Sequence, residues 1–313
     1  MSASQILIRN PNHRLVIGYN SEPDRFSFDR IDISMAAPIL YDSHMHTHLC
    51  QHAYDQPTDY AQQAAARGLK GIVFTCHNPT ENNAFEPGVR MRVDQFEEYV
   101  QLIEATRQQW QGRVDVRLGL ESDYFPGHED WLAELYDRAE FDYILGSIHP
   151  QLLGYWRPYH NGDPVAFQRT YFEHLAMSAE SGLFDCLGHP DQIKNVPPTE
   201  WSLDRIMPDI IRALDRIAAT GVAMELNTYG LHRQIKEMHP APAMLVAMKK
   251  RDIPIVLGSD AHNAQRVAAD FENALDLLTA TGYTTVTYFL KRQRHTVALD
   301  TARASLRNSQ KSG

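Results

Sequence analysis

The stretch "YDSHMHTHLCQHA" at residues 41–53 holds four histidines, one aspartate and one cysteine. It follows the apolar run "APIL" at residues 37–40, which indicates a buried strand. His44 and His46 are two positions apart, so their side chains point to the same side of that strand and can chelate one ion. So many imidazoles at the end of a buried strand indicate a metal site.

Six similar runs follow along the chain, and a longer segment with helical spacing comes after each of the seven runs. The expected strands lie within residues 37–46, 69–77, 114–125, 141–150, 183–191, 221–230 and 253–262. The expected helices lie within residues 57–68, 92–110, 130–140, 163–182, 203–221, 241–252 and 264–282, and Gly68, Gly182 and Gly221 stand where three of them should end. This alternation predicts a parallel sheet, open or closed.

Every strand run ends in a residue that can bind metal or transfer a proton. In chain order these residues are His44 and His46 with His52 beyond, His77, Glu121 with Asp123, His149, His189 with Asp191, Glu225 with Asn227, and Asp260 with His262. We favour a barrel over an open sheet, because α/β barrels carry their site at the C-terminal ends of the strands. Imidazole and carboxylate ligands suit zinc, manganese or iron, and a carboxylate such as Glu121 could bridge two ions.

Charge and composition narrow the class of protein. The chain has 313 residues and a net charge of −9, which argues against binding to a nucleic-acid backbone. It contains neither an apolar run long enough for a membrane span nor a secretory signal, so we expect a soluble protein. Three cysteines are consistent with the reducing cytoplasm. A small phosphorylated substrate is compatible with the acidic charge, and the sequence does not indicate an oligomeric state.

Other polar residues receive simpler interpretations. Cys50 and Cys76 are expected to be small packing groups beside the ligands rather than metal thiolates. Asp42 is expected to hydrogen-bond a ligating imidazole. Asp123 and Asp191 either orient ligands or cap the next helix. Surface or capping roles are expected for His13, His48, His128, His174, His239 and His295.

The set of motifs resembles the PHP (polymerase and histidinol phosphatase) superfamily from about residue 39 to about residue 295. The motifs are "DSHMHT…CQHA", "FTCHNP", "GLESDY", "ILGSIHP", "LGHPD", "ELNTYG" and "LGSDAH", in the family order. The resemblance implies a distorted (β/α)7 barrel with two to three divalent ions (Zn, Mn or Fe) at the C-terminal mouth. By that resemblance His44, His46, Glu121 and Asp260 hold one ion, Glu121, His149 and His189 a second, and His52, His77 and His262 a third.

Within this superfamily the chain looks most like the monofunctional histidinol-phosphate phosphatases. The segment "ELNTYGLHRQIKEMHPAPAML" resembles a family region whose arginine is thought to meet the phosphate. His232 stands at that position and Arg233 follows it, while Lys194 stands where the family often has a second cation. His160 or His232 could protonate the leaving alcohol.

The sequence therefore predicts hydrolysis of L-histidinol phosphate to L-histidinol and phosphate by a metal-bound hydroxide. Glu121 and Asp260 are the catalytic residues of this hypothesis, and Asp260 orients the attacking water or accepts its proton. A PHP phosphoesterase for a nucleotide or sugar phosphate is the first alternative. A metal-dependent amidohydrolase and a non-catalytic metal-binding protein are the others; amidohydrolases usually use a carbamylated lysine, and no predicted strand tip carries lysine.

Three segments are expected along the chain. Residues 1–38 form an N-terminal extension with a hairpin around "NPNH" at residues 10–13. Residues 39–300 form the barrel, and residues 301–313 form a flexible polar tail.

Overall fold

The computed structural model describes residues 6–9, 15–19, 27–30, 37–86 and 88–307. The chain divides into two compact units, Met1–Ala36 and Ala37–Gly313. In the first unit, β1 (Ile6–Arg9), β2 (Leu15–Tyr19) and β3 (Ser27–Arg30) pair in that order as an antiparallel sheet. The antiparallel pairing of β1 with β2 is the one a hairpin requires, and its connecting residues 10–14 lie outside the described residues.

The second unit is built on a nine-stranded sheet, ordered from β12 to β4. Its first seven strands along the chain, β4 to β10, pair in parallel with their sequence neighbours. They are β4 (Tyr41–Asp42), β5 (Gly71–Phe74), β6 (Asp115–Asp123), β7 (Tyr143–Ser147), β8 (Cys186–Leu187), β9 (Ala223–Asn227) and β10 (Ile255–Gly258). Each of these strands lies inside one of the seven predicted runs.

The first and seventh parallel strands come together through the segments that follow them. The backbone NH of Ser43 donates to the carbonyl of Leu257 at 3.1 Å. Further along, His46 NH donates to Ala261 O at 2.9 Å, and Ala261 NH donates to His44 O at 3.2 Å. These bonds join the two ends of the seven-stranded array, as a barrel requires.

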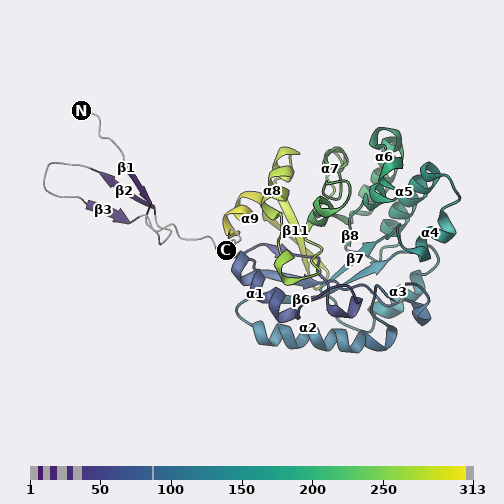
Figure 1. Cartoon of the computed structure of the whole chain (residues 1–313), viewed down its shortest axis with the longest axis horizontal. Helices are drawn as coiled ribbons and strands as arrows, with labels where there is room; N and C mark the ends of the chain where they lie inside the picture. The colour runs from purple at the N-terminus through teal and green to yellow at the C-terminus, as the bar shows by residue number, and fades with distance from the viewer. Residues whose placement is uncertain (1–5, 10–14, 20–26, 31–36, 87, 308–313) are drawn as a thin grey trace. The chain divides into compact units, whose positions relative to one another are not determined.

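Helices surround the strands (Figure 1). The seven predicted helices appear as α1 (Pro57–Arg67), α2 (Phe96–Trp110), α3 (Glu129–Tyr136), α5 (Pro164–Glu180), α6 (Leu203–Thr220), α7 (Pro242–Lys249) and α8 (Phe271–Ala280). Gly68 and Gly221 end α1 and α6 in the left-handed conformation, with φ of 75° and 74°. No helix in the described part of the chain is long and apolar enough to cross a membrane.

In the second unit the sequence interpretation missed two α-helices and two strands. They are α4 (Leu153–Tyr159), the antiparallel pair β11 (Thr285–Leu290) and β12 (Gln293–Ala298), and α9 (Leu299–Ser305). The segment predicted as a polar tail begins within α9, where Ala302 is fully buried. Residues 308–313 lie outside the described residues.

Alternation along the strands separates two apolar clusters. One large cluster packs strands against helices and includes Leu120, Ile144 and Met224. A smaller cluster takes its members from the opposite side of the same strands: Tyr41, Val73, Tyr143, Leu145, Cys186, Ala223, Val256 and Phe289. Because side chains alternate along a strand, Glu225 in β9 continues the side of Ala223, and Glu121 in β6 lies on the side opposite to Leu120. The inward side of these strands therefore ends in candidate site residues.

Candidate metal centre

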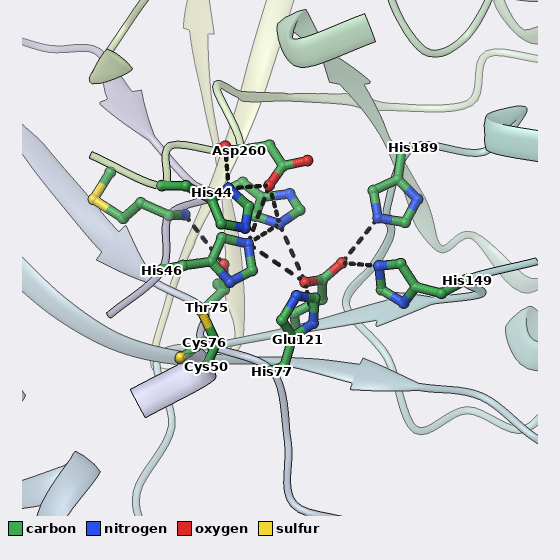
Figure 2. Close-up of polar contacts among 12 residues, drawn as sticks. His44, His46, Cys50, Thr75, Cys76, His77, Glu121, His149, His189 and Asp260 are labelled. Atoms are coloured by element: carbon green, nitrogen blue, oxygen red, sulfur yellow. Dashed lines mark hydrogen bonds and ion pairs between the residues drawn. The ribbon is translucent and has the colours of Figure 1, made fainter. Parts of the chain in front are cut away.

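Glu121, near the end of β6, is surrounded by five imidazoles (Figure 2). Its Oε2 lies 2.9 Å from His77 Nδ1, 3.5 Å from His44 Nε2 and 3.6 Å from His46 Nε2. Its Oε1 lies 2.9 Å from His189 Nε2 and 3.4 Å from His149 Nε2. One buried carboxylate thus faces imidazoles that follow four different strands.

Asp260 lies on the other side of His44 and His46. Its Oδ1 is 3.1 Å from His46 Nε2 and 3.6 Å from His44 Nε2. The ring of His262 stacks on that of His46 with centroids 4.1 Å apart, and the ring of His52 is 4.6 Å from that of His262. The structure therefore brings together all nine predicted ligands, which we call the ligand cluster: His44, His46, His52, His77, Glu121, His149, His189, Asp260 and His262.

The donor atoms of the cluster fit a cation. The Nε2 atoms of His44 and His46 are 3.2 Å apart, so the two ring nitrogens converge on one region. Glu121 Oε2 accepts no hydrogen bond of acceptable geometry from the described residues, although three imidazole nitrogens surround it. Buried polar atoms are normally satisfied, and nitrogen and carboxylate donors at this spacing match the preferences of divalent transition metals.

The pKa values of the cluster residues agree in part with the binding of a cation. Burial raises the pKa of Glu121, but His77, His44 and His149 outweigh burial and hold its pKa well below the usual range. Burial lowers the pKa of His77 to about 4, so this imidazole is neutral, as a ligand must be. Burial lowers the pKa of His46 as well, but the hydrogen bonds to Asp260 and Cys76 and the charges of Glu121 and Asp260 together outweigh burial and raise the pKa to about 9. Cation binding would therefore displace a proton from His46.

Five groups of three side chains, within the ligand cluster or at its border, have donor atoms close enough to share one ion. Three of them consist of imidazoles and carboxylates: His44 with His46 and Glu121, His77 with Glu121 and His149, and His46 with His77 and His262. Two others include thiols: His46 with Cys50 and Cys76, and Cys50 with His52 and His262. Both cysteines are fully buried, and Thr47 Oγ1 donates to Cys76 Sγ at 3.2 Å. The thiols therefore pack directly behind the imidazoles and within reach of a shared ion.

Glu225, and not Asp42 as the sequence suggested, hydrogen-bonds the imidazole of a predicted ligand. Glu225 Oε1 lies 2.7 Å from His44 Nδ1, and its Oε2 accepts from the backbone NH of His189 at 2.7 Å. A Cβ at Gly258 would lie 1.9 Å from Glu225 Oε1, so only glycine leaves room for this carboxylate. The prediction for Asp42 is wrong, because its carboxylate accepts from backbone and hydroxyl donors of Ser259 and from the backbone NH of Ala268.

Asp123 orients a ligand rather than capping a helix. It accepts from His149 Nδ1 and from Arg90 Nη2. Arg90 Nη1 also donates to the carbonyl of Asn78 at 3.1 Å, next to His77. All of these side chains are buried, and burial raises the pKa of Asp123 while Arg90 and His149 lower it further, below the usual range. Arg90 therefore joins the segment after β5 to the carboxylate that holds His149.

We expect Arg90→Met to destabilise the fold by about 3–5 kcal/mol, because it leaves the charge of Asp123 buried without its guanidinium partner. The unfolding midpoint in urea measures this loss. Arg92→Met is the matched control, because Arg92 pairs with Asp94 at the exposed surface, where an ion pair contributes little. Equal midpoints for the two variants would contradict the role given to Arg90.

Of the four residues predicted to bind substrate, His232 and Arg233 both lie beside Tyr229, whereas Lys194 and His160 lie elsewhere. Lys194 is fully buried, and its Nζ donates to Met238 O at 2.7 Å and to Asp191 Oδ2 at 3.1 Å. Of the other three, His160 stacks on Trp156 at 4.5 Å, His232 Nε2 contacts Arg266 Nη1 at 2.7 Å, and Arg233 places its Cζ 4.8 Å from the Tyr229 ring centroid.

Asp191 belongs to the same buried group as Lys194. Its Oδ1 also lies 2.7 Å from His239 Nδ1, and its Oδ2 accepts from the backbone NH of Ala241 at 2.7 Å. Asp191 thus joins the loop after β8 to the loop before α7. His239 is a buried structural partner rather than a surface residue.

Comparison with known proteins adds two findings on the sequence. The PHP domain model matches residues 42–229. A "probable histidinol-phosphatase" of Deinococcus radiodurans is 38% identical over 257 residues, which cover 80% of this chain and 96% of that protein. The histidinol-phosphatase of Bacillus subtilis is 25% identical over 262 residues, covering 75% of this chain and 98% of that protein.

One solved structure supports the fold. The crystal structure of a histidinol phosphate phosphatase from Lactococcus lactis, in complex with zinc, L-histidinol and phosphate, superposes with a TM-score of 0.70 at 20% identity. The match covers 82% of this chain and 98% of that chain. This likeness confirms the predicted barrel architecture.

Proposed function

Since this chain belongs to the PHP family, we propose that it is a metal-dependent phosphomonoesterase that hydrolyses L-histidinol phosphate to L-histidinol and phosphate. The observation that carries the proposal is the ligand cluster, in which one carboxylate faces five imidazoles at the mouth of a barrel. The 38% identity to a relative named as a probable histidinol-phosphatase supports the choice of substrate.

We assign two to three divalent ions, zinc, manganese or iron, to the ligand cluster. His44, His46, Glu121 and Asp260 would hold the first, Glu121 with His149 and His189 the second, and His52, His77 and His262 the third. Bound divalent ions would lower the pKa of water and neutralise charge on the phosphoryl oxygens.

The chain's own side chains orient the reaction. Asp260 Oδ2 lies 3.4 Å from Asn227 Nδ2, and Asp260 would orient the attacking water or take its proton. Glu225 and Asp123 fix the rings of His44 and His149 through their Nδ1 atoms, which leaves Nε2 of each ring directed at Glu121. The leaving alcohol needs a proton, for which His160 and His232 are the candidates.

A panel of phosphate esters tests the proposal. L-Histidinol phosphate, nucleotides and sugar phosphates are each given to protein that has been stripped of metal and reloaded with one ion. We expect the highest kcat/KM for L-histidinol phosphate. A clear preference for a nucleotide or sugar phosphate would support the metal centre but reject L-histidinol phosphate as the substrate. That outcome would favour the first alternative from the sequence, a PHP phosphoesterase for another ester.

A further inference from the structure

Arg266 lies one aromatic ring away from the ligand cluster. It is the last residue of a 3-10 helix, Ala264–Arg266, that follows the segment carrying His262. The ring centroid of Tyr229 is 6.0 Å from that of His262 and 5.5 Å from Arg266 Cζ. Tyr229 therefore separates a candidate metal ligand from a guanidinium group.

Much of the hydrogen-bonding capacity of Arg266 is unused. Its Nη1 lies 2.7 Å from His232 Nε2, but its Nε and Nη2 are shielded from solvent and have no hydrogen-bond partner among the described residues. Buried donors in native proteins are normally satisfied, so these two nitrogens require an explanation.

The neighbours of Arg266 cannot all be satisfied together. His232 Nε2 is also 3.1 Å from Asp270 Oδ2. A single ring nitrogen either donates to that carboxylate or accepts from Arg266, and it cannot do both. The direct ion pair from Arg266 Nη1 to Asp270 Oδ2 is long, at 3.7 Å. Arg266 is thus held in place without being fully neutralised.

The two unused nitrogens form one edge of the guanidinium group. Nε and Nη2 together present two parallel N–H donors, the arrangement that binds two oxygens of a phosphate or carboxylate. Two buried cations near the cluster are already paired with carboxylates, Arg90 with Asp123 and Lys194 with Asp191, and of Arg90 only Nε lacks a partner among the described residues.

We propose that Arg266 binds the phosphoryl group of the substrate through Nε and Nη2. The inference rests on the proposed phosphatase function and deepens it. Since both nitrogens are shielded, the side chain has to move to expose them when the anion enters. The guanidinium then lies beside the Tyr229 ring rather than behind it, and the phosphoryl group is held between this cationic side chain and the metal ligands.

Binding of inorganic phosphate to the metal-loaded, full-length chain tests this role without turnover. We expect Arg266→Met to weaken phosphate binding about 10- to 100-fold in isothermal titration calorimetry, because charge-assisted hydrogen bonds are lost. KM for the ester should rise with it. Gln265→Met, at the exposed neighbouring position, should bind phosphate as the wild type does. Metal content is measured in each protein.

Phosphate affinity of Arg266→Met within twofold of the wild type would overturn the inference. If that variant does not fold, Arg266→Lys decides, because lysine keeps the charge but lacks the two-nitrogen edge; wild-type affinity in it would overturn the proposal. Arg266-dependent phosphate binding in a protein inactive on L-histidinol phosphate would reject the substrate and keep the inference. Activity on L-histidinol phosphate with a phosphate affinity that does not depend on Arg266 would keep the substrate and reject the inference.

Discussion

Replacing Glu121 with glutamine is expected to lower kcat/KM by roughly three orders of magnitude or more, because the ions that Glu121 would help to hold supply several kcal/mol of charge stabilisation. Glutamine keeps the shape of the side chain but removes the negative charge that five imidazoles face. Loss of an outer partner of a metal ligand already costs 10- to 100-fold in ion affinity, so loss of the carboxylate itself should cost at least about as much.

Steady-state phosphate release and ion binding measure the two effects separately. Glu180→Gln is the control, since Glu180 pairs with Arg216 at the surface between α5 and α6. Circular dichroism should show the same fold in both variants. A Glu121→Gln protein that keeps wild-type turnover would remove Glu121 from the reaction, and full activity in Asp260→Asn would do the same for Asp260.

Removal of bound metal is the second large effect. We expect a chelator to reduce phosphate release to background and one of zinc, manganese or iron to restore it. Stability should change with activity, because an ion that binds only the folded state adds about 2.7 kcal/mol at 100 times its dissociation constant. For a chain of 313 residues that corresponds to a rise of roughly 4 °C in the unfolding midpoint.

Two readouts check this expectation. Differential scanning calorimetry of stripped and reloaded protein follows the midpoint, and phosphate release is followed in the same samples. Reloading stripped protein with calcium alone is a suitable control and should not restore activity, since calcium is a hard cation that prefers oxygen ligands to imidazoles. Full activity in protein without measurable metal would contradict the metal-dependent mechanism.

The seven-unit barrel and the convergence of the nine candidate ligands on one place could be predicted from the sequence for a simple reason. Parallel strands present their C-terminal ends at one edge of the sheet. The residues at the ends of the seven runs, such as His149 and Asp260, must therefore lie near one another. The alternation of side chains then decides which of them face inward. His44 and His46 share one side, as their two-residue spacing predicts, and both lie in the cluster, although the alternation that starts at Tyr41 is interrupted after β4.

The partners of those ligands could not be predicted, because they depend on which loops meet in space. Arg90 lies in an irregular segment, where an arginine is usually solvated, yet it is buried against Asp123. Lys194 shows the opposite outcome: a loop lysine expected to meet phosphate is enclosed by Asp191 and Met238. Glu225 was visible at a strand tip, but its bond to His44 depends on the packing of β9 against the segment after β4.

Phosphate release from L-histidinol phosphate, followed as stripped protein takes up a divalent ion, tests the central claim most directly. The number of ions bound per chain and the rate are measured in the same samples. We predict no release without metal and a maximum rate once two to three ions are bound. Tight binding of those ions with no hydrolysis of any phosphate ester would contradict the phosphatase function, and hydrolysis by the metal-free chain would contradict the role of the ligand cluster.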